Sequence, residues 1–156
     1  MTMMKKVIAA AAVFGASALA VHAEPAVVFD LGGKFDKSFN ESAYNGAQRW
    51  ASENNATFRE IELQSEAQRE QALRRFAEAG ANPIVMAGFA FATALSEVAP
   101  DYPDTKFAII DMVVDAPNVR SVVFNEHEGS FLVGMMAAEA SKSTSSATVN
   151  TALAAV

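Results

Sequence analysis

Residues 27–46 read VVFDLGGKFDKSFNESAYNG, and this stretch decides the fold. An apolar run that ends in Asp30 predicts a buried strand whose last residue leaves the sheet. A glycine-containing loop follows, and Phe39 then stands at the start of a helical pattern. In an open parallel sheet, ligands bind beyond the carboxyl ends of the strands. An acid and an aromatic residue at that edge favour recognition of a small polar ring over catalysis.

Short apolar runs alternate with helical patterns along the rest of the chain, which predicts an α/β fold with a parallel sheet and helices on both of its faces. The run at 57–63 alternates imperfectly and is expected near an edge of the sheet. The last helix has Phe131, Leu132, Met135 and Met136 on its apolar side. The expected strands are 26–29, 57–63, 83–86, 106–110 and 119–124, and the expected helices are 38–54, 65–80, 89–98 and 126–140.

Two capping boxes mark where the first two helices begin. They are SFNE at 38–41 and SEAQ at 65–68. In such a box the serine hydroxyl and the side chain three residues later satisfy free amides of the first helical turn. The first helix then presents Ala43, Ala47 and Trp50 on one apolar face.

Three strand ends deliver candidate ligand-binding residues to one edge of the predicted sheet. Asp30 and Asp111 each follow a buried strand, and both carboxylates can accept hydrogen bonds from ring or hydroxyl donors. Gly88 follows a third strand and has no side chain, so a ligand can come close to the backbone there. Phe89 is its neighbour.

The start of the first helix adds an aromatic and an amide side chain. Phe39 is placed to stack on a base, a contact worth about 1–3 kcal/mol per base in nucleic-acid proteins. Asn40 offers both a donor and an acceptor. The residues alone are equally compatible with a structural arrangement, in which Phe39 is a buried staple and the acids cap loops. The candidate ligand-binding residues are Asp30, Phe39, Asn40, Gly88, Phe89 and Asp111.

The sequence contains no recognisable catalytic constellation. Glu126, His127 and Glu128 are consecutive and would point in different directions from a helix, and Ser130 lacks the second glycine of a nucleophile elbow. Neither a dinucleotide-binding glycine motif nor a phosphate-binding loop occurs. We therefore expect a protein that is not an enzyme and that needs no metal or cofactor.

Residues 1–23 have the pattern of a secretory signal peptide. Lys5 and Lys6 precede an apolar stretch, and VHA at 21–23 is a small-x-small cleavage site. Without these two lysines, 10 basic residues stand against 18 acidic ones, a net charge of −8. That charge argues against nucleic acid or an anionic membrane as partner. Because the sequence has no cysteine, we expect no disulfide and no lipid anchor, and a periplasmic protein peripheral to the plasma membrane.

The composition changes after Ala140. Residues 141–156 read SKSTSSATVNTALAAV, a run of Ser, Thr and Ala with no aromatic residue and no acid. Such a segment can bury little apolar surface, so we expect a disordered tail outside the folded domain.

Four blocks of the sequence resemble the basic membrane protein family, the PnrA-like substrate-binding proteins of ABC transporters. The first and last blocks are the more specific. The resemblance implies a type I periplasmic-binding-protein fold with two lobes around a cleft, of which residues 24–140 would form the first lobe only. The blocks are FDLGGKFDKSFNESAYNGAQRW at 29–50, PIVMAGFAFATAL at 83–95, KFAIIDM at 106–112 and NEHEGSFLVGMMAA at 125–138.

The resemblance also implies a ligand and a partner. Family ligands are mainly purine nucleosides, which are passed to an inner-membrane ABC permease. The family's stacking aromatic falls on Phe39, its strand-end acids fall on Asp30 and Asp111, and a polar neighbour falls on Asn40. We expect a monomer.

Family members continue well past this chain's end, and the match is expected to stop near Ala140, as a shifted reading frame or premature stop would produce. A chain that holds half of a two-lobed site is expected to bind nucleosides weakly or not at all. The alternatives are a sensory domain of the same fold that presents a ligand to a membrane kinase, and an exported nucleoside hydrolase, for which the residues are lacking.

Overall fold

Five parallel strands form a single sheet in the computed structural model, which describes residues 23–141. Their order is β2-β1-β3-β4-β5, so β2 lies at an edge as the sequence predicts. The α/β class and the parallel sheet are confirmed. The predicted signal peptide, apart from Ala23, and the tail beyond Ser141 lie outside the described residues. The strands are β1 (Ala26–Phe29), β2 (Arg59–Glu62), β3 (Ile84–Ala87), β4 (Phe107–Ile110) and β5 (Val119–Val122).

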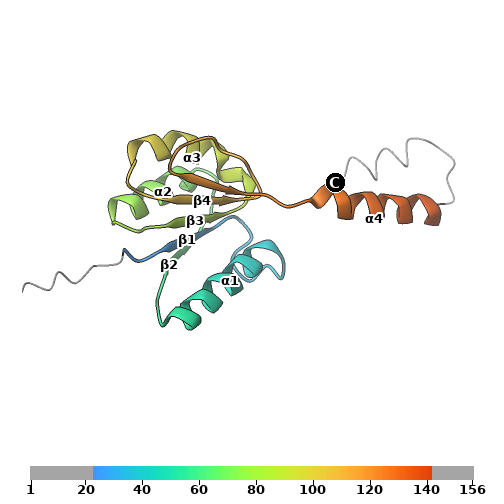
Figure 1. Cartoon of the computed structure of the whole chain (residues 1–156), viewed down its shortest axis with the longest axis horizontal. Coiled ribbons are helices and arrows are strands. Elements are labelled where there is room, and N and C mark those ends of the chain that lie inside the picture. Colours follow the sequence, from blue (N-terminus) through green and yellow to red (C-terminus); the bar gives the residue numbers. More distant parts are fainter. Residues whose placement is uncertain (1–22, 142–156) are drawn as a thin grey trace, which may run out of the picture.

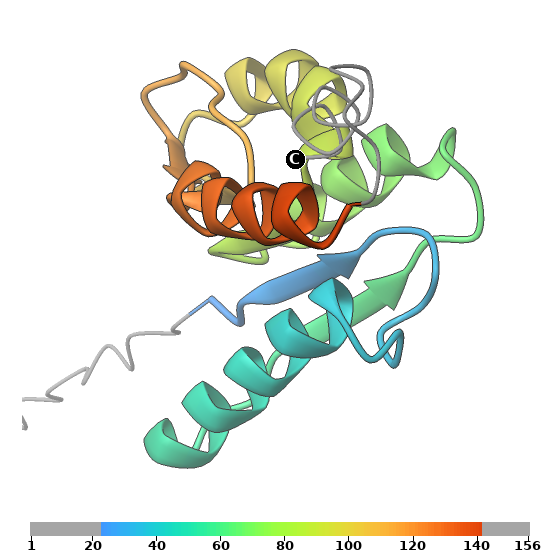
Figure 2. The same cartoon turned by 90° about the vertical axis from the view of Figure 1, so that its right-hand side faces the viewer.

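Helices cover both faces of this sheet, but unequally. Figures 1 and 2 show α1 on one face and α2 with α3 on the other. We call the side under α2 and α3 the closed face and the side under α1 the open face. The helices are α1 (Phe39–Asn54), α2 (Gln68–Glu78), α3 (Ala92–Val98) and α4 (Glu126–Ala140), with 3₁₀ turns η1 (Phe89–Phe91) and η2 (Ala99–Asp101) on either side of α3.

Alternation along the central strand divides its residues between the two faces. Ala26 and Val28 belong to the core of the closed face, while Val27 and Phe29 belong to the small core of the open face. This follows from the two-residue period of a strand. All four are buried, which is the pattern of a strand covered on both sides.

The elements differ from the predicted ones mainly at their ends. The predicted helix 89–98 begins as the 3₁₀ turn η1, and another 3₁₀ turn containing Pro100 follows it. Strand β5 ends at Val122, because Val123 and Phe124 leave the sheet and are exposed. On α1 the predicted apolar face is partly correct. Ala43 and Ala47 pack on the open-face core, but Trp50 is exposed.

Helix α4 lies apart from the sheet. Figure 1 shows it extending away from the strands. Its predicted apolar side is uncovered, with Phe131, Leu132, Met135 and Met136 between 56% and 69% exposed. The assignment of α4 to the first lobe therefore stays a prediction.

Candidate functional site

All six sequence-predicted site residues line one pocket at the carboxyl edge of the sheet. Its volume is about 310 Å³, at the lower end of the range for small-molecule sites. The ends of β1, β3 and β4 form its floor, and the start of α1 forms one wall. The pocket is lined by Asp30, Leu31, Asp36, Phe39, Asn40, Ala87, Gly88, Phe89, Ala90 and Asp111.

Two aromatic rings stand at the rim of this pocket. Phe39 is 38% exposed and Phe89 is 63% exposed, although both are large apolar side chains. The structure thus does not bury Phe39 as a staple, one of the two arrangements that the residues left open. Each ring has a surface that a planar ligand could cover.

Asn40 is buried, and its side chain holds the glycine loop. It is 4% exposed, and its Nδ2 donates to the carbonyl oxygens of Asp30 at 3.2 Å, Gly33 at 3.2 Å and, more weakly, Leu31 at 3.5 Å. The side-chain amide nitrogen of Asn40, which the sequence predicts as a ligand donor, therefore donates to the loop backbone instead. Asn40 shapes the pocket, and a ligand contact of its own stays a prediction.

The start of α1 is capped by Asp36, not by the predicted serine. No side-chain hydrogen bond comes from Ser38. Asp36 Oδ1 instead accepts from the backbone amides of Ser38 at 2.8 Å and Glu41 at 3.1 Å, and Oδ2 accepts from the amide of Asn40 at 3.1 Å. Burial raises the pKa of the Asp36 carboxyl, but these amide hydrogen bonds outweigh it and bring the pKa below its ordinary value.

The second predicted capping box is half formed. Gln68 Oε1 accepts from the backbone amides of Gln64 at 2.7 Å and Ser65 at 3.2 Å, which is the return contact of the box. No side-chain cap bond precedes α2, whose N-cap is Ala67. The start of α2 is nevertheless fixed.

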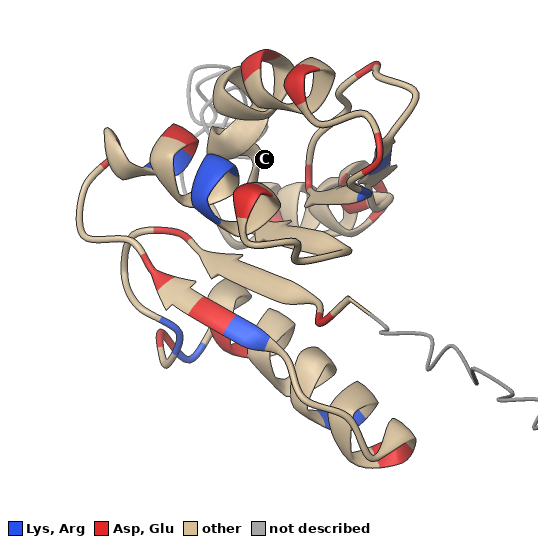
Figure 3. Ribbon diagram, turned by 90° about the vertical axis from the view of Figure 1, so that its left-hand side faces the viewer, with Lys and Arg blue, Asp and Glu red and all other residues tan. Residues whose placement is uncertain are grey.

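Lys34 ties the glycine loop to the edge strand. Its backbone amide donates to Glu62 Oε2 at 2.9 Å, and its ammonium group pairs with Glu60. The hydrogen bond to Glu60 is the main cause of a raised pKa for Lys34. The ammonium also lies 4.8 Å from the centre of the Tyr44 ring on α1. Figure 3 shows the acidic and basic residues that stand side by side along β2.

The two candidate acids have different surroundings. Asp30 forms an ion pair with Arg69 of α2, whereas the structure gives the Asp111 carboxylate no hydrogen-bond or ion-pair partner among residues 23–141. Asp111 has a left-handed backbone with φ of +71°, and its amide donates to Val122 O at 2.7 Å. A non-glycine residue in that region is uncommon and is often found at functional sites.

Sequence reasoning missed Asp36 and Arg69. The position of Asp36, two residues before Ser38, was a signal, because aspartate accepts amides of the following residues in a turn. No comparable signal marked Arg69 in the sequence, because one more charged residue on a helix predicts only a solvated face.

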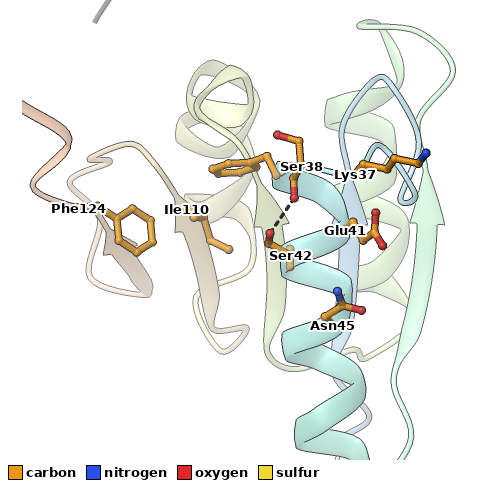
Figure 4. Close-up of a pocket in the computed structure, with 9 residues that line it drawn as sticks. Lys37, Ser38, Glu41, Ser42, Asn45, Ile110 and Phe124 are labelled. Carbon is orange, nitrogen blue, oxygen red and sulfur yellow. Dashed lines mark hydrogen bonds between the residues drawn. The ribbon is translucent and has the colours of Figure 1, made fainter. Parts of the chain in front are cut away.

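A larger and more open hollow adjoins the pocket at Phe39. Figure 4 shows Ile110 and Phe124 on one side of it and Ser38, Ser42 and Asn45 of α1 on the other. Its volume is about 970 Å³. It lies on the open face, so the pocket at the strand ends continues onto a broad uncovered surface.

Among residues 23–141, no three His, Cys, Asp or Glu side chains are grouped so that they could hold a metal ion. Within that same range, none of the helices combines the length and the apolar character that crossing a membrane requires.

The architecture is that of solute-binding proteins of ABC transporters. A solved solute-binding protein from Aeropyrum pernix K1 superimposes with a TM-score of 0.70 at 38% identity, over 75% of this chain and 32% of that one. A solute-binding protein from Conexibacter woesei gives a TM-score of 0.59 at 25% identity, over 74% of this chain and 40% of that one.

The sequence comparison then identifies the family. The model for ABC transporter substrate-binding proteins of the PnrA-like type matches residues 23–152, and the chain belongs to this family. It is a family of binding proteins, not of enzymes. The match passes Ala140 into the segment that we expected to lie outside the family. Because the structure does not describe residues 142–156, the predicted boundary at Ala140 is not tested and stays a prediction.

Curated relatives agree with this assignment. An uncharacterized lipoprotein of Pyrococcus horikoshii is 36% identical over 115 residues, 72% of this chain and 28% of the relative. The ABC transporter nucleoside-binding protein BmpA of Lactococcus lactis is 33% identical over 122 residues, 75% of this chain and 35% of the relative. The matched part of the chain thus spans about a third of these relatives. Although some of them are lipoproteins, this sequence has no cysteine.

Proposed function

We propose that this chain is an extracytoplasmic solute-binding component of an ABC importer and supplies one wall of a site for a purine nucleoside or a similar small solute. The main support is the convergence of the six candidate residues on one pocket. They come from four separate places in the sequence, and the pocket occupies the edge of the sheet where ligands bind in parallel α/β folds. The nucleoside-binding relative from Lactococcus lactis supports the ligand class.

Each wall of the pocket has a distinct task in this proposal. The exposed ring of Phe39 stacks on the base, and Phe89 covers part of its edge. The carboxylates of Asp30 and Asp111 accept hydrogen bonds from ring N–H groups or ribose hydroxyls. Gly88 lets the ligand approach the end of β3. The protein would bind and release its ligand without chemical change.

The remaining parts of the proposal concern place and partners. The signal-peptide pattern at 1–23 supports export to the periplasm, and the lack of cysteine fits a protein without a thiol-linked lipid. The family supports an inner-membrane permease as the partner that receives the ligand.

Calorimetric titration of the full chain with inosine, guanosine and cytidine tests the ligand class. We expect weak binding, because this wall leaves the opposite side of the ligand in water, with purines preferred. Phe39→Ala should weaken purine binding about 5- to 150-fold, the range of a lost base stack. Phe35→Ala is the matched control, because Phe35 is an exposed aromatic residue in the loop before α1 and does not line the pocket. Equal losses from both variants, or tighter binding of cytidine than of inosine and guanosine, would contradict the proposal.

A sensory domain of the same fold is the second candidate. A solved protein described as a transcriptional activator of the comK gene from Bacillus halodurans gives a TM-score of 0.59 at 25% identity, over 76% of this chain. A permease gene beside this one would favour import, whereas a kinase gene would favour sensing.

A further inference from the structure

Arg69 stands directly behind the pocket without lining it. It lies in the first turn of α2, and its guanidinium meets the Asp30 carboxylate as a two-pronged fork. Nε donates to Oδ1 at 3.1 Å, and a terminal nitrogen donates to Oδ2 at 3.2 Å. The side chains of Arg69 and Asp30 are 14% and 19% exposed, so the pair is largely withdrawn from water.

The same guanidinium also lies near the turn after β3, the strand beside β1. Its central carbon lies 5.8 Å from the centre of the Phe91 ring, which is fully buried and belongs to the turn that presents Phe89. One side chain therefore touches the end of β1 and the turn after β3. Because Gln68 anchors the start of α2, Arg69 is held on an ordered helical turn.

We propose that Arg69 is a positioning residue of the nucleoside site, an inference that rests on the function proposed above. Its fork fixes the rotamer of Asp30, so that the remaining lone pairs of the two oxygens face the pocket. It also places a positive charge behind a wall that otherwise contains three aspartates. The wall then carries less excess negative charge when it accepts hydrogen bonds from a neutral ligand. A lysine offers a point charge and cannot replace a planar fork.

The ion pair is tested first without ligand. In ¹⁵N-edited NMR spectra of the full chain, the Arg69 Nε–H group should give a separate, slowly exchanging signal. Asp30→Asn should shift that signal and speed its exchange. Arg74→Gln should leave it unchanged, because Arg74 lies on the same helix but pairs with Glu70 and Asp101. The proposal would be overturned if the Arg69 Nε–H signal exchanged fast and did not change in the Asp30→Asn variant.

The effect on binding is tested next, with inosine as the probe and shifts of pocket amides as the signal. Arg69→Gln should weaken binding about 10-fold or more, since hydrogen bonds to a charged group are being lost. Arg69→Lys should restore only part of that loss, and Arg74→Gln should have no effect.

A double-mutant cycle separates positioning from a merely structural role. If Arg69 acts through Asp30, Arg69→Gln should have little further effect in the Asp30→Asn background. An undiminished loss in that background would show that Arg69 supports the fold only, and would overturn the proposal. If inosine and guanosine shift no amide of the wild-type chain, the proposed function fails for this chain. The ligand-free experiment still decides whether Arg69 fixes Asp30.

Discussion

The two faces of the sheet share the same strands but differ in how completely they are covered. On the closed face, Phe91, Leu95 and Phe107 are fully buried in one continuous core between the sheet and the helices that cover it. On the open face, α1 is the only helix among residues 23–141 that covers the core, whose buried members are Val27, Phe29 and Ala87. Strand alternation makes both faces apolar, but only covering elements turn an apolar face into a core. The closed face should therefore determine stability, and the open face is free to serve binding.

Two adjacent residues of β4 give the largest expected contrast. Ile109 is fully buried in the closed-face core, whereas Ile110 is half-buried and lines the hollow on the open face. Ile109→Ala should lower the free energy of unfolding by about 2–5 kcal/mol, because it leaves a cavity in a packed core. Ile110→Ala should cost about 1 kcal/mol or less, because water already reaches that side chain. Urea unfolding of both variants measures the difference. Equal losses would mean that the open face is as well covered as the closed one.

Gly88, where the pocket meets the end of β3, gives the next largest effect. Its φ of +122° and ψ of +153° fall in a region that is essentially restricted to glycine. Gly88→Ala should destabilise the protein by about 1–3 kcal/mol through backbone strain alone. Steric contact contributes little, because the nearest atom to the added Cβ would be Asp30 Oδ2 at 4.0 Å.

Gly46 is the matched control for that substitution. It lies in the exposed middle of α1, and an added Cβ would meet nothing within 4 Å. Gly46→Ala should raise stability by about 0.5–1 kcal/mol through helix propensity. Thermal unfolding of the two variants should shift in opposite directions. A stabilising Gly88→Ala would show that the conformation at the pocket is not fixed.

Much of this arrangement could be predicted from the sequence because it is local. The strand that ends before Asp30 follows from apolar runs and breakers, and the parallel order brings the strand ends together. What could not be predicted depends on distant partners. The pairing of Arg69 with Asp30 joins residues 39 positions apart. The burial of Asn40 depends on a loop conformation that places three carbonyls around one amide. The uncovered state of Trp50 depends on the absence of a second helix beside α1 on the described open face.

A smaller effect concerns pH and the cap on α1, the only helix on the open face in the described chain. Because hydrogen bonds lower the native pKa of Asp36, the unfolded chain takes up the proton first as the pH falls. The stabilisation from this carboxylate is thus fully present above the ordinary aspartate pKa of about 3.9 and is lost as the pH falls through the lower native value.

Asp36→Asn should be less stable than wild type at pH 7, and the free energies of unfolding of the two proteins should converge in acid. Denaturant unfolding from pH 7 down to about pH 2, below the lowered native pKa, measures this. A difference that stayed constant in acid would assign the cap to another group.

The smallest effect is expected on α4, which lies apart from both faces. Phe131 is as large as the phenylalanines of the closed face, but its side chain is 60% exposed. Phe131→Gln should change the free energy of unfolding by less than about 0.5 kcal/mol, since a substitution outside any packed contact removes little. Phe107→Gln on the closed face is the control and should be severely destabilising, because it buries an amide without a partner. Urea unfolding of both variants gives the comparison. If Phe131→Gln were also strongly destabilising, α4 would have to pack against the sheet or against another molecule in solution. The division between a stable closed face and an uncovered open face would then need revision.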